Sequence, residues 1–215
     1  MADNKLVSDP VNALTATASK YPAYQDLLKF LGSNQPSIRF ADLGPETRGE
    51  YEYGPRYGNA GEIRMNKNSL RDIRPYTSES NARTLIHETT HATDRQLDKL
   101  FSDYQGNPPT PELTQFVDAY RKLRWNATRP NANFQSSPSE ALARRLDPEW
   151  ARKNAGYRAH TEELYGHAVG NVAQTPGDKP YSEFGVPLHL NPTLATEHFI
   201  LLDLADRAQK SLRAK

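Results

Sequence analysis

The chain has 215 residues, no cysteine, and 27 lysines and arginines against 26 aspartates and glutamates. The lack of cysteine excludes disulfides, thiolate nucleophiles, cysteine-ligated zinc and iron–sulfur clusters. The charge balance lacks the basic excess typical of nucleic-acid-binding proteins, and no apolar run approaches the ~18 residues needed to cross a membrane. We therefore expect a single domain over 1–215, with neither nucleic acid nor a membrane as partner.

The first third of the chain predicts short helices followed by strands. Residues 1–35 form an N-terminal helical segment, in which two helices over 9–31 are broken at Tyr21 and Pro22. Apolar and polar residues alternate over 37–42, which indicates a half-buried strand. Tyrosines and glycine-containing turns over 51–66 predict a β-hairpin or meander.

The rest of the chain is dominated by helical patterns. The strongest predicted helix runs from about residue 78 to 101, with Glu79 well placed in its first turn. Further helices are predicted over 110–125, 139–146, 148–154, 161–174 and 192–213, with loops between them. The sequence thus predicts an α+β fold, mostly helical, with a small antiparallel or mixed sheet preceding the main helix.

That main helix carries the motif His87-Glu88-Thr-Thr-His91. Residues i and i+4 of an α-helix share one face, so both imidazoles can reach a single metal ion. Glu88 cannot comfortably join them as a ligand, but it lies beside the position of a metal-bound water. A zinc ion lowers the pKa of such a water to about 7, and a glutamate there can take its proton. We therefore predict one zinc ion held by His87 and His91, with Glu88 as general base.

A catalytic zinc site needs a third protein ligand. Metzincins have Gly and His three and six residues after the second histidine, where this chain has Asp94 and Leu97. The absence of cysteine and of a Gly-Thr pair excludes peptide-deformylase and aspzincin sites. A glutamate on a later helix remains, and the candidates are Glu163, Glu162 and Glu140.

Residues 84–94 and 160–171 together resemble gluzincin-type zinc metallopeptidases, both the thermolysin-like and the ImmA/IrrE-type arrangement. In these families a small residue three positions after the ligating glutamate allows close helix packing, and a polar residue follows it. Gly166 and His167 match that pattern if Glu163 is the ligand. The resemblance implies a zincin-like domain with His87, His91 and Glu163 as metal ligands.

Several other residues have possible supporting roles. Asp94 shares the face of the histidines and either orients a ligand imidazole or is a solvated charge. Tyr165 and Tyr157 either donate to an oxyanion or pack in the core. We expect three further histidines not to be ligands, with the last of them packing on the apolar side of its helix: His160, His189 and His198.

Three segments have competing interpretations. By resemblance, 62–66 is an edge strand that pairs with an extended substrate; otherwise it is an ordinary sheet strand. The tyrosines over 51–57 either stack on sugars or bases or are ordinary strand composition, and we expect the second. The basic stretch 121–124 is expected to be a solvated helix face.

The predicted function is zinc-dependent hydrolysis of a peptide or amide bond, with a peptide, a protein or the peptide part of peptidoglycan as substrate. The alternative is a structural or interaction protein, such as a virion or assembly component, with a structural or vestigial metal site. Its docking surfaces would be 9–31 and 192–213, and His167 as a fourth ligand would favour it. The start of the chain lacks a signal-peptide pattern, so we expect a cytoplasmic location, with virion association and a phage origin suggested by resemblance.

Overall fold

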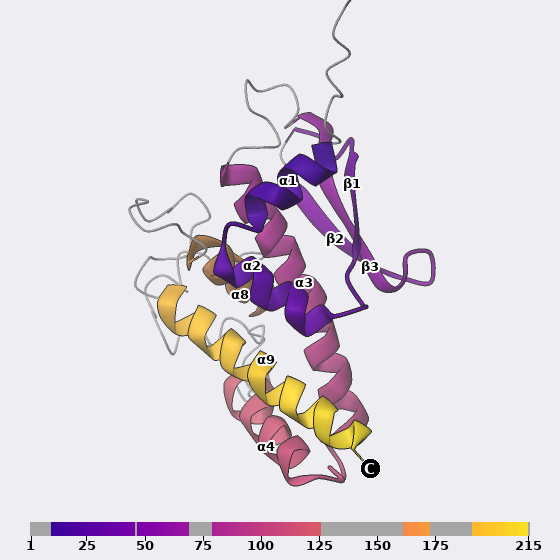
Figure 1. Cartoon of the computed structure of the whole chain (residues 1–215), viewed down its shortest axis with the longest axis vertical. Helices are drawn as coiled ribbons and strands as arrows, with labels where there is room; N and C mark the ends of the chain where they lie inside the picture. The colour runs from indigo at the N-terminus through magenta and orange to yellow at the C-terminus, as the bar shows by residue number, and fades with distance from the viewer. Residues whose placement is uncertain (1–9, 46, 69–78, 126–160, 173–190, 215) are drawn as a thin grey trace, which may run out of the picture.

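The computed structural model describes residues 10–45, 47–68, 79–125, 161–172 and 191–214, and it has the predicted α+β architecture (Figure 1). The elements are α1 (Pro10–Ala18), α2 (Pro22–Leu31), β1 (Ser37–Ala41), β2 (Gly49–Gly54), β3 (Gly58–Asn66), α3 (Glu79–Tyr104), α4 (Pro111–Tyr120), the π-helical segment η2 (Arg121–Trp125), α8 (Thr161–Val172) and α9 (Asn191–Arg213). The short helices predicted over 139–146 and 148–154 lie outside the described residues. Within the described residues, no helix is long and apolar enough to cross a membrane.

The three described strands form a mixed sheet in the order β1-β3-β2. β2 and β3 pair antiparallel, with Tyr51 opposite Ile63, while β1 pairs parallel to β3, with Phe40 opposite Met65. The short turn between β2 and β3 makes them neighbours, and β1 takes the free side of β3. The prediction that 62–66 is an edge strand is therefore wrong, because β3 is the central strand; among the described strands, β2 lies at an edge.

The N-terminal helices break where the sequence predicted. Tyr21 is extended (φ −96°, ψ 120°) because Pro22 disfavours a helical conformation in the residue before it, and Pro22 then occupies the first turn of α2. Gly32 ends α2 with a positive φ of 55°. The buried side chains of Leu14, Tyr24 and Leu27 belong to the core, and both helices contact α3.

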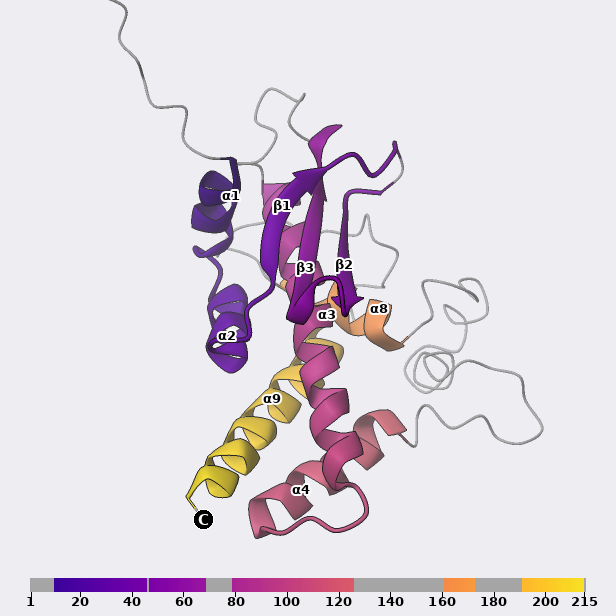
Figure 2. The ribbon, with the colours of Figure 1, turned by 90° about the vertical axis from the view of Figure 1, so that its right-hand side faces the viewer.

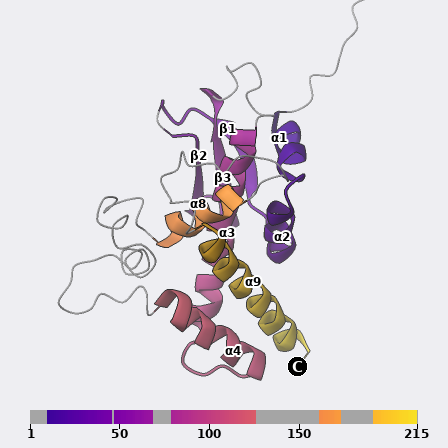
Figure 3. The same cartoon turned by 90° about the vertical axis from the view of Figure 1, so that its left-hand side faces the viewer.

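Helix α3 runs through the molecule and contacts most other elements. Its N-terminal half packs on the sheet and on α8, and its C-terminal half lies beside α4 and α9 (Figures 2 and 3). Leu85 and Ile86 are fully buried beside the His-Glu-x-x-His motif, and Leu97 and Phe101 continue the core toward α4. The motif is therefore carried by the most extensively packed helix of the described structure.

Helix α4 begins where predicted, with the Thr110 side chain accepting a hydrogen bond from the Leu113 amide. It continues as the π-helical turn η2, in which Arg124 is only 3 % exposed. The expectation that 121–124 is a solvated face is wrong for Arg124. Arg124 can be buried because its guanidinium forms an ion pair with the buried carboxylate of Asp94.

Candidate metal centre

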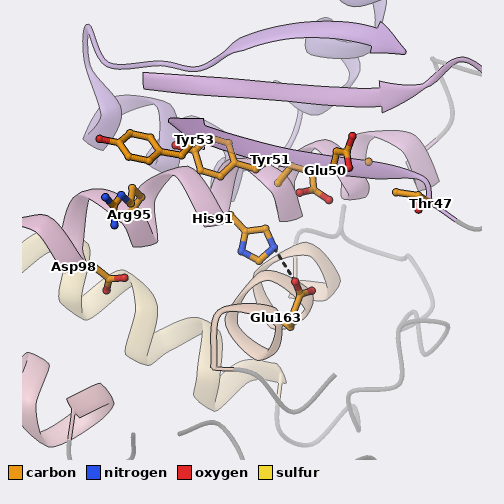
Figure 4. Close-up of a pocket in the computed structure, with 10 residues that line it drawn as sticks. Thr47, Glu50, Tyr51, Tyr53, His91, Arg95, Asp98 and Glu163 are labelled. Carbon is orange, nitrogen blue, oxygen red and sulfur yellow. Dashed lines mark ion pairs between the residues drawn. The ribbon is translucent and has the colours of Figure 1, made fainter. Parts of the chain in front are cut away.

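Three potential metal ligands converge between α3 and α8. The Nε2 atoms of His87 and His91 are 2.9 Å apart, and the Glu163 carboxylate oxygens lie 3.4 Å from His87 Nε2 and 3.6 Å from His91 Nε2. One ligand atom from each side chain lies within 4.8 Å of the other two. Figure 4 shows His91 and Glu163 facing one another from their two helices.

Two glycines allow α8 to approach α3 this closely. A Cβ atom on Gly166 would lie 2.8 Å from Cε1 of His87, and one on Gly170 would lie 3.2 Å from the carbonyl oxygen of Arg83. Real Cβ atoms essentially never come within 3.0 Å of such a heavy atom, so a side chain at position 166 would force the His87 ring or α8 to shift. The small residue expected three positions after Glu163 therefore has the expected packing role.

Burial keeps both imidazoles neutral near pH 7. It lowers the pKa of His87 to about 4 and that of His91 to about 3, with the neighbouring His87 contributing to the lowering at His91. The backbone of Gly166 hydrogen-bonds to the His87 ring and raises its pKa, so the backbone group is the carbonyl acceptor. A hydrogen bond at one ring nitrogen fixes the tautomer and leaves the other nitrogen free for a metal.

Glu88 lies beside the three ligands and is only 6 % exposed. Its Oε1 is 4.0 Å from His87 Nε2, and its carboxylate accepts a hydrogen bond from the backbone N–H of Tyr51 on β2. Burial, followed by the charges of Glu163 and Glu50, raises the pKa of Glu88 to about 8. A carboxyl group with a pKa near neutrality can both accept and donate a proton.

The donor set fits a zinc ion. Two ligands that each lie about 2.0–2.1 Å from a tetrahedral ion are about 3.3 Å apart, close to the separations of the His87, His91 and Glu163 atoms. Two imidazoles and one carboxylate also match the ligand class of catalytic zinc sites, which keep a fourth position open. A cavity of about 740 Å³ opens beside His91, Glu163 and Glu88.

His167 lies at the edge of this group. Its Nε2 is 3.8 Å from Oε2 of Glu163, and its ring centroid is 4.4 Å from that of His87. Among the described side chains, His167 does not join the set of ligand atoms within 4.8 Å of one another. The described arrangement therefore has three potential ligand side chains and a polar neighbour beside them.

Asp94 is buried, with 1 % of its surface exposed, so the expectation of a solvated helix charge is wrong. It forms an ion pair with Arg124 and lies 3.4 Å from Nδ1 of His198. His198 also hydrogen-bonds to Thr93 and Arg124, which confirms its expected role as a packing histidine. These contacts place Asp94 in a buried network that joins α3, η2 and α9, and they give no support to its orienting a ligand imidazole.

Tyr165 belongs to the same network. Its ring is fully buried under the guanidinium of Arg124, 4.1 Å from the ring centroid, and its hydroxyl donates to Glu197. Of the two roles considered for Tyr165, donation to an oxyanion and packing in the core, the structure supports packing. Four remaining candidates lie outside the described residues: Glu140, Tyr157, His160 and His189. Glu162 lies on α8, but its side chain is not among those that the structure describes.

The structure also places at the cavity residues that were not expected to belong to the site. They come from β2, from the residues just before it and from the continuation of α3: Thr47, Gly49, Glu50, Tyr51, Tyr53, Arg95 and Asp98 (Figure 4). Arg95 follows His91 by four residues, so helical spacing alone could have placed it on the ligand face. The β2 residues had no such signal because the strand order was not predictable from the sequence.

Comparison of the chain with protein-family models, with curated proteins and with solved structures finds no match. The candidate centre therefore stands on the geometry of His87, His91, Glu163 and Glu88. Their arrangement is a buried, neutral and convergent donor set beside an open cavity.

Proposed function

We propose that this protein hydrolyses peptide or amide bonds with a zinc ion held by His87, His91 and Glu163. The observation that carries the proposal is the convergence of these three side chains beside a buried carboxyl group, Glu88, at the wall of a cavity. A purely structural zinc site has four protein ligands and no use for an adjacent proton acceptor. The presence of Glu88 therefore favours hydrolysis over a structural role.

In the proposed reaction, water adds across the amide bond: its hydroxyl joins the carbonyl carbon and its proton reaches the leaving nitrogen. When bound, a zinc ion supplies Lewis acidity toward the carbonyl oxygen and acidity toward water. The Glu88 carboxylate accepts the proton of the attacking water and then donates it to the amine as the carbon–nitrogen bond breaks. The Tyr51 amide, hydrogen-bonded to this carboxylate, holds it in place for both transfers.

The edge strand β2 supports a peptide as the substrate class. It forms one wall of the cavity, directly above α3 and opposite Glu163 (Figure 4). Edge strands have backbone groups free for pairing with an extended peptide. Pairing with an extended substrate, which was expected for 62–66, is therefore proposed for Gly49–Gly54 instead.

The test is cleavage of a mixed peptide library, followed by mass spectrometry, by zinc-loaded and EDTA-treated protein. We expect cleavage only with zinc, and a loss of about 100-fold or more in Glu88→Gln, since general bases contribute about 10²–10⁴ to rate. Glu79→Gln removes an exposed carboxylate from the same helix and should cleave as fast as the unaltered protein. Absence of cleavage by the zinc-loaded chain, or equal rates for Glu88→Gln, would contradict the proposal and favour an assembly role.

A further inference from the structure

The cavity extends beyond the metal ligands to a second polar group. Arg95 lies one helical turn after His91 on α3, and its guanidinium lies 4.3 Å from the ring centroid of Tyr53 on β2. Both residues line the cavity, at the end away from Thr47 (Figure 4). The proposed reaction gives this end of the cavity no role.

Arg95 is exposed, and in the described part of the chain it forms no ion pair with a carboxylate within 4.0 Å. Two arginines of the sheet do have such partners: Arg39 pairs with Glu62 at 2.8 Å, and Arg64 pairs with Glu50 at 2.6 Å. Among the described residues that line the cavity, Arg95 alone carries a full positive charge. A planar guanidinium without a partner is suited to bind a carboxylate through two parallel hydrogen bonds.

Tyr53 holds this guanidinium in position. Its ring is 43 % exposed and covers one face of the Arg95 group. Stacking on an aromatic ring restricts the arginine but leaves the N–H groups at its edge free to donate. Asp98, the nearest acidic residue along the helix face, accepts a hydrogen bond from the Tyr120 hydroxyl, so one of its oxygens is already engaged.

We propose that Arg95, stacked on Tyr53, is a specificity subsite that binds a carboxylate of the peptide substrate. This inference rests on the proposed function and names the substrate class: peptides with an acidic side chain or a free C-terminal carboxylate near the cleaved bond. Four helical residues advance about 6 Å, and an extended peptide advances about 3.3 Å per residue. The carboxylate therefore belongs about two residues from the bond that is hydrolysed.

Binding at the subsite is tested without any turnover. The probes are acetylated tetrapeptides that end in glutamate amide, in glutamine amide, or in alanine with a free carboxylate. They are titrated into zinc-loaded Glu88→Gln protein, and the Nε–Hε resonance of Arg95, identified by its loss in Arg95→Met, is followed by NMR. We expect a saturable shift with at least one carboxylate peptide and none with the glutamine amide. If the Arg95 resonance shifts with the glutamate amide peptide, the subsite binds a side-chain carboxylate; if it shifts with the alanine peptide, the subsite binds a C-terminal carboxylate. If the resonance shifts with neither peptide, the subsite is overturned.

Specificity is tested in the library cleavage assay with Arg95→Met, Arg95→Lys and, as a matched control, Arg39→Met on the far edge of the sheet. A charged hydrogen bond is worth about tenfold or more in affinity, so we expect KM for carboxylate peptides to rise about tenfold in Arg95→Met. kcat should change little, KM for amide peptides should not change, and Arg95→Lys should recover part of the effect. Cleavage with no carboxylate preference would overturn the subsite alone. If a carboxylate peptide shifts the Arg95 resonance but no peptide is cleaved, the proposed hydrolysis is overturned and the carboxylate subsite is not.

Discussion

Gly166 lies so close to the imidazole of His87 that a Cβ atom there would be 2.8 Å from the Cε1 atom of the ring. The same glycine accepts a hydrogen bond from that ring through its backbone. It therefore sets both the spacing between α8 and α3 and the orientation of one proposed ligand. Glu163, three residues earlier on α8, depends on this contact for its own position.

Gly166→Ala is expected to weaken zinc binding. The added methyl group must displace either the His87 ring or helix α8, and loss of such supporting contacts weakens metal affinity by about 10- to 100-fold. Competition with a zinc-binding dye measures the dissociation constant. Gly106→Ala is the matched control, because a Cβ there meets no atom within 4 Å. Equal affinities for the two variants would refute this role for Gly166.

The buried ion pair between Arg124 and Asp94 is expected to dominate the energetics of the network behind the site. Their side chains are 4 % and 2 % exposed. Arg124→Met would leave a buried charge without its partner, which lowers the free energy of unfolding by about 3–5 kcal/mol. Urea unfolding measures the loss.

The control for that experiment is Arg207→Met, which breaks a pair with Asp203 whose side chains are 54 % and 64 % exposed. Exposed pairs contribute about 0–1 kcal/mol, so this variant should unfold nearly as the unaltered chain does. The double variant Arg124→Met/Asp94→Leu should be more stable than the sum of the single losses predicts. If Arg124→Met and Arg207→Met lower the free energy of unfolding by similar amounts, the buried pair does not have the dominant role expected here.

Stability of the metal-free chain is expected to fall below about pH 6.5 in part because of His198. Burial, then the positive charge of Arg124, then His91, lowers the pKa of His198 well below its ordinary value of 6.5. Below that pH the unfolded chain binds a proton at His198 that the folded chain does not, so the free energy of unfolding decreases as the pH falls. Each such proton contributes up to about 1.4 kcal/mol per pH unit.

Urea unfolding in EDTA at several values from about pH 7.5 to about pH 5 measures this dependence. The slope should be shallower in His198→Gln, whose side chain does not titrate. The buried His87 and His91 lower the stability in the same direction in both proteins, so the difference between the slopes isolates His198. Parallel slopes would show that His198 has no such effect.

The helices of this fold were predictable because their signals are local. Pro22 and Gly32 mark the two ends of α2, and Thr110 with Pro111 marks the start of α4. The His-Glu-x-x-His motif on α3 was equally clear, because its spacing fixes two side chains on one face of a helix.

Features that depend on tertiary structure were harder to predict. No local pattern indicated that β1 would pair with β3 and leave β2 as an edge strand at the cavity. The burial of Arg124 and Asp94 depends on the π-helical turn η2 and on contacts with α9, which lies far away in the sequence. For the third ligand, the sequence left three glutamates open, and only the resemblance favoured Glu163 among them.

The most direct test of the account is the metal content of the purified chain and of two neighbouring variants, measured by elemental analysis after incubation with zinc. Glu163→Ala removes the proposed third ligand, and Glu162→Ala removes the adjacent carboxylate as a matched control. The account predicts about one zinc ion per chain in the unaltered protein and in Glu162→Ala, and a loss of zinc in Glu163→Ala. An unaltered chain without zinc, or a Glu163→Ala variant that binds zinc as tightly as the unaltered chain, would contradict it.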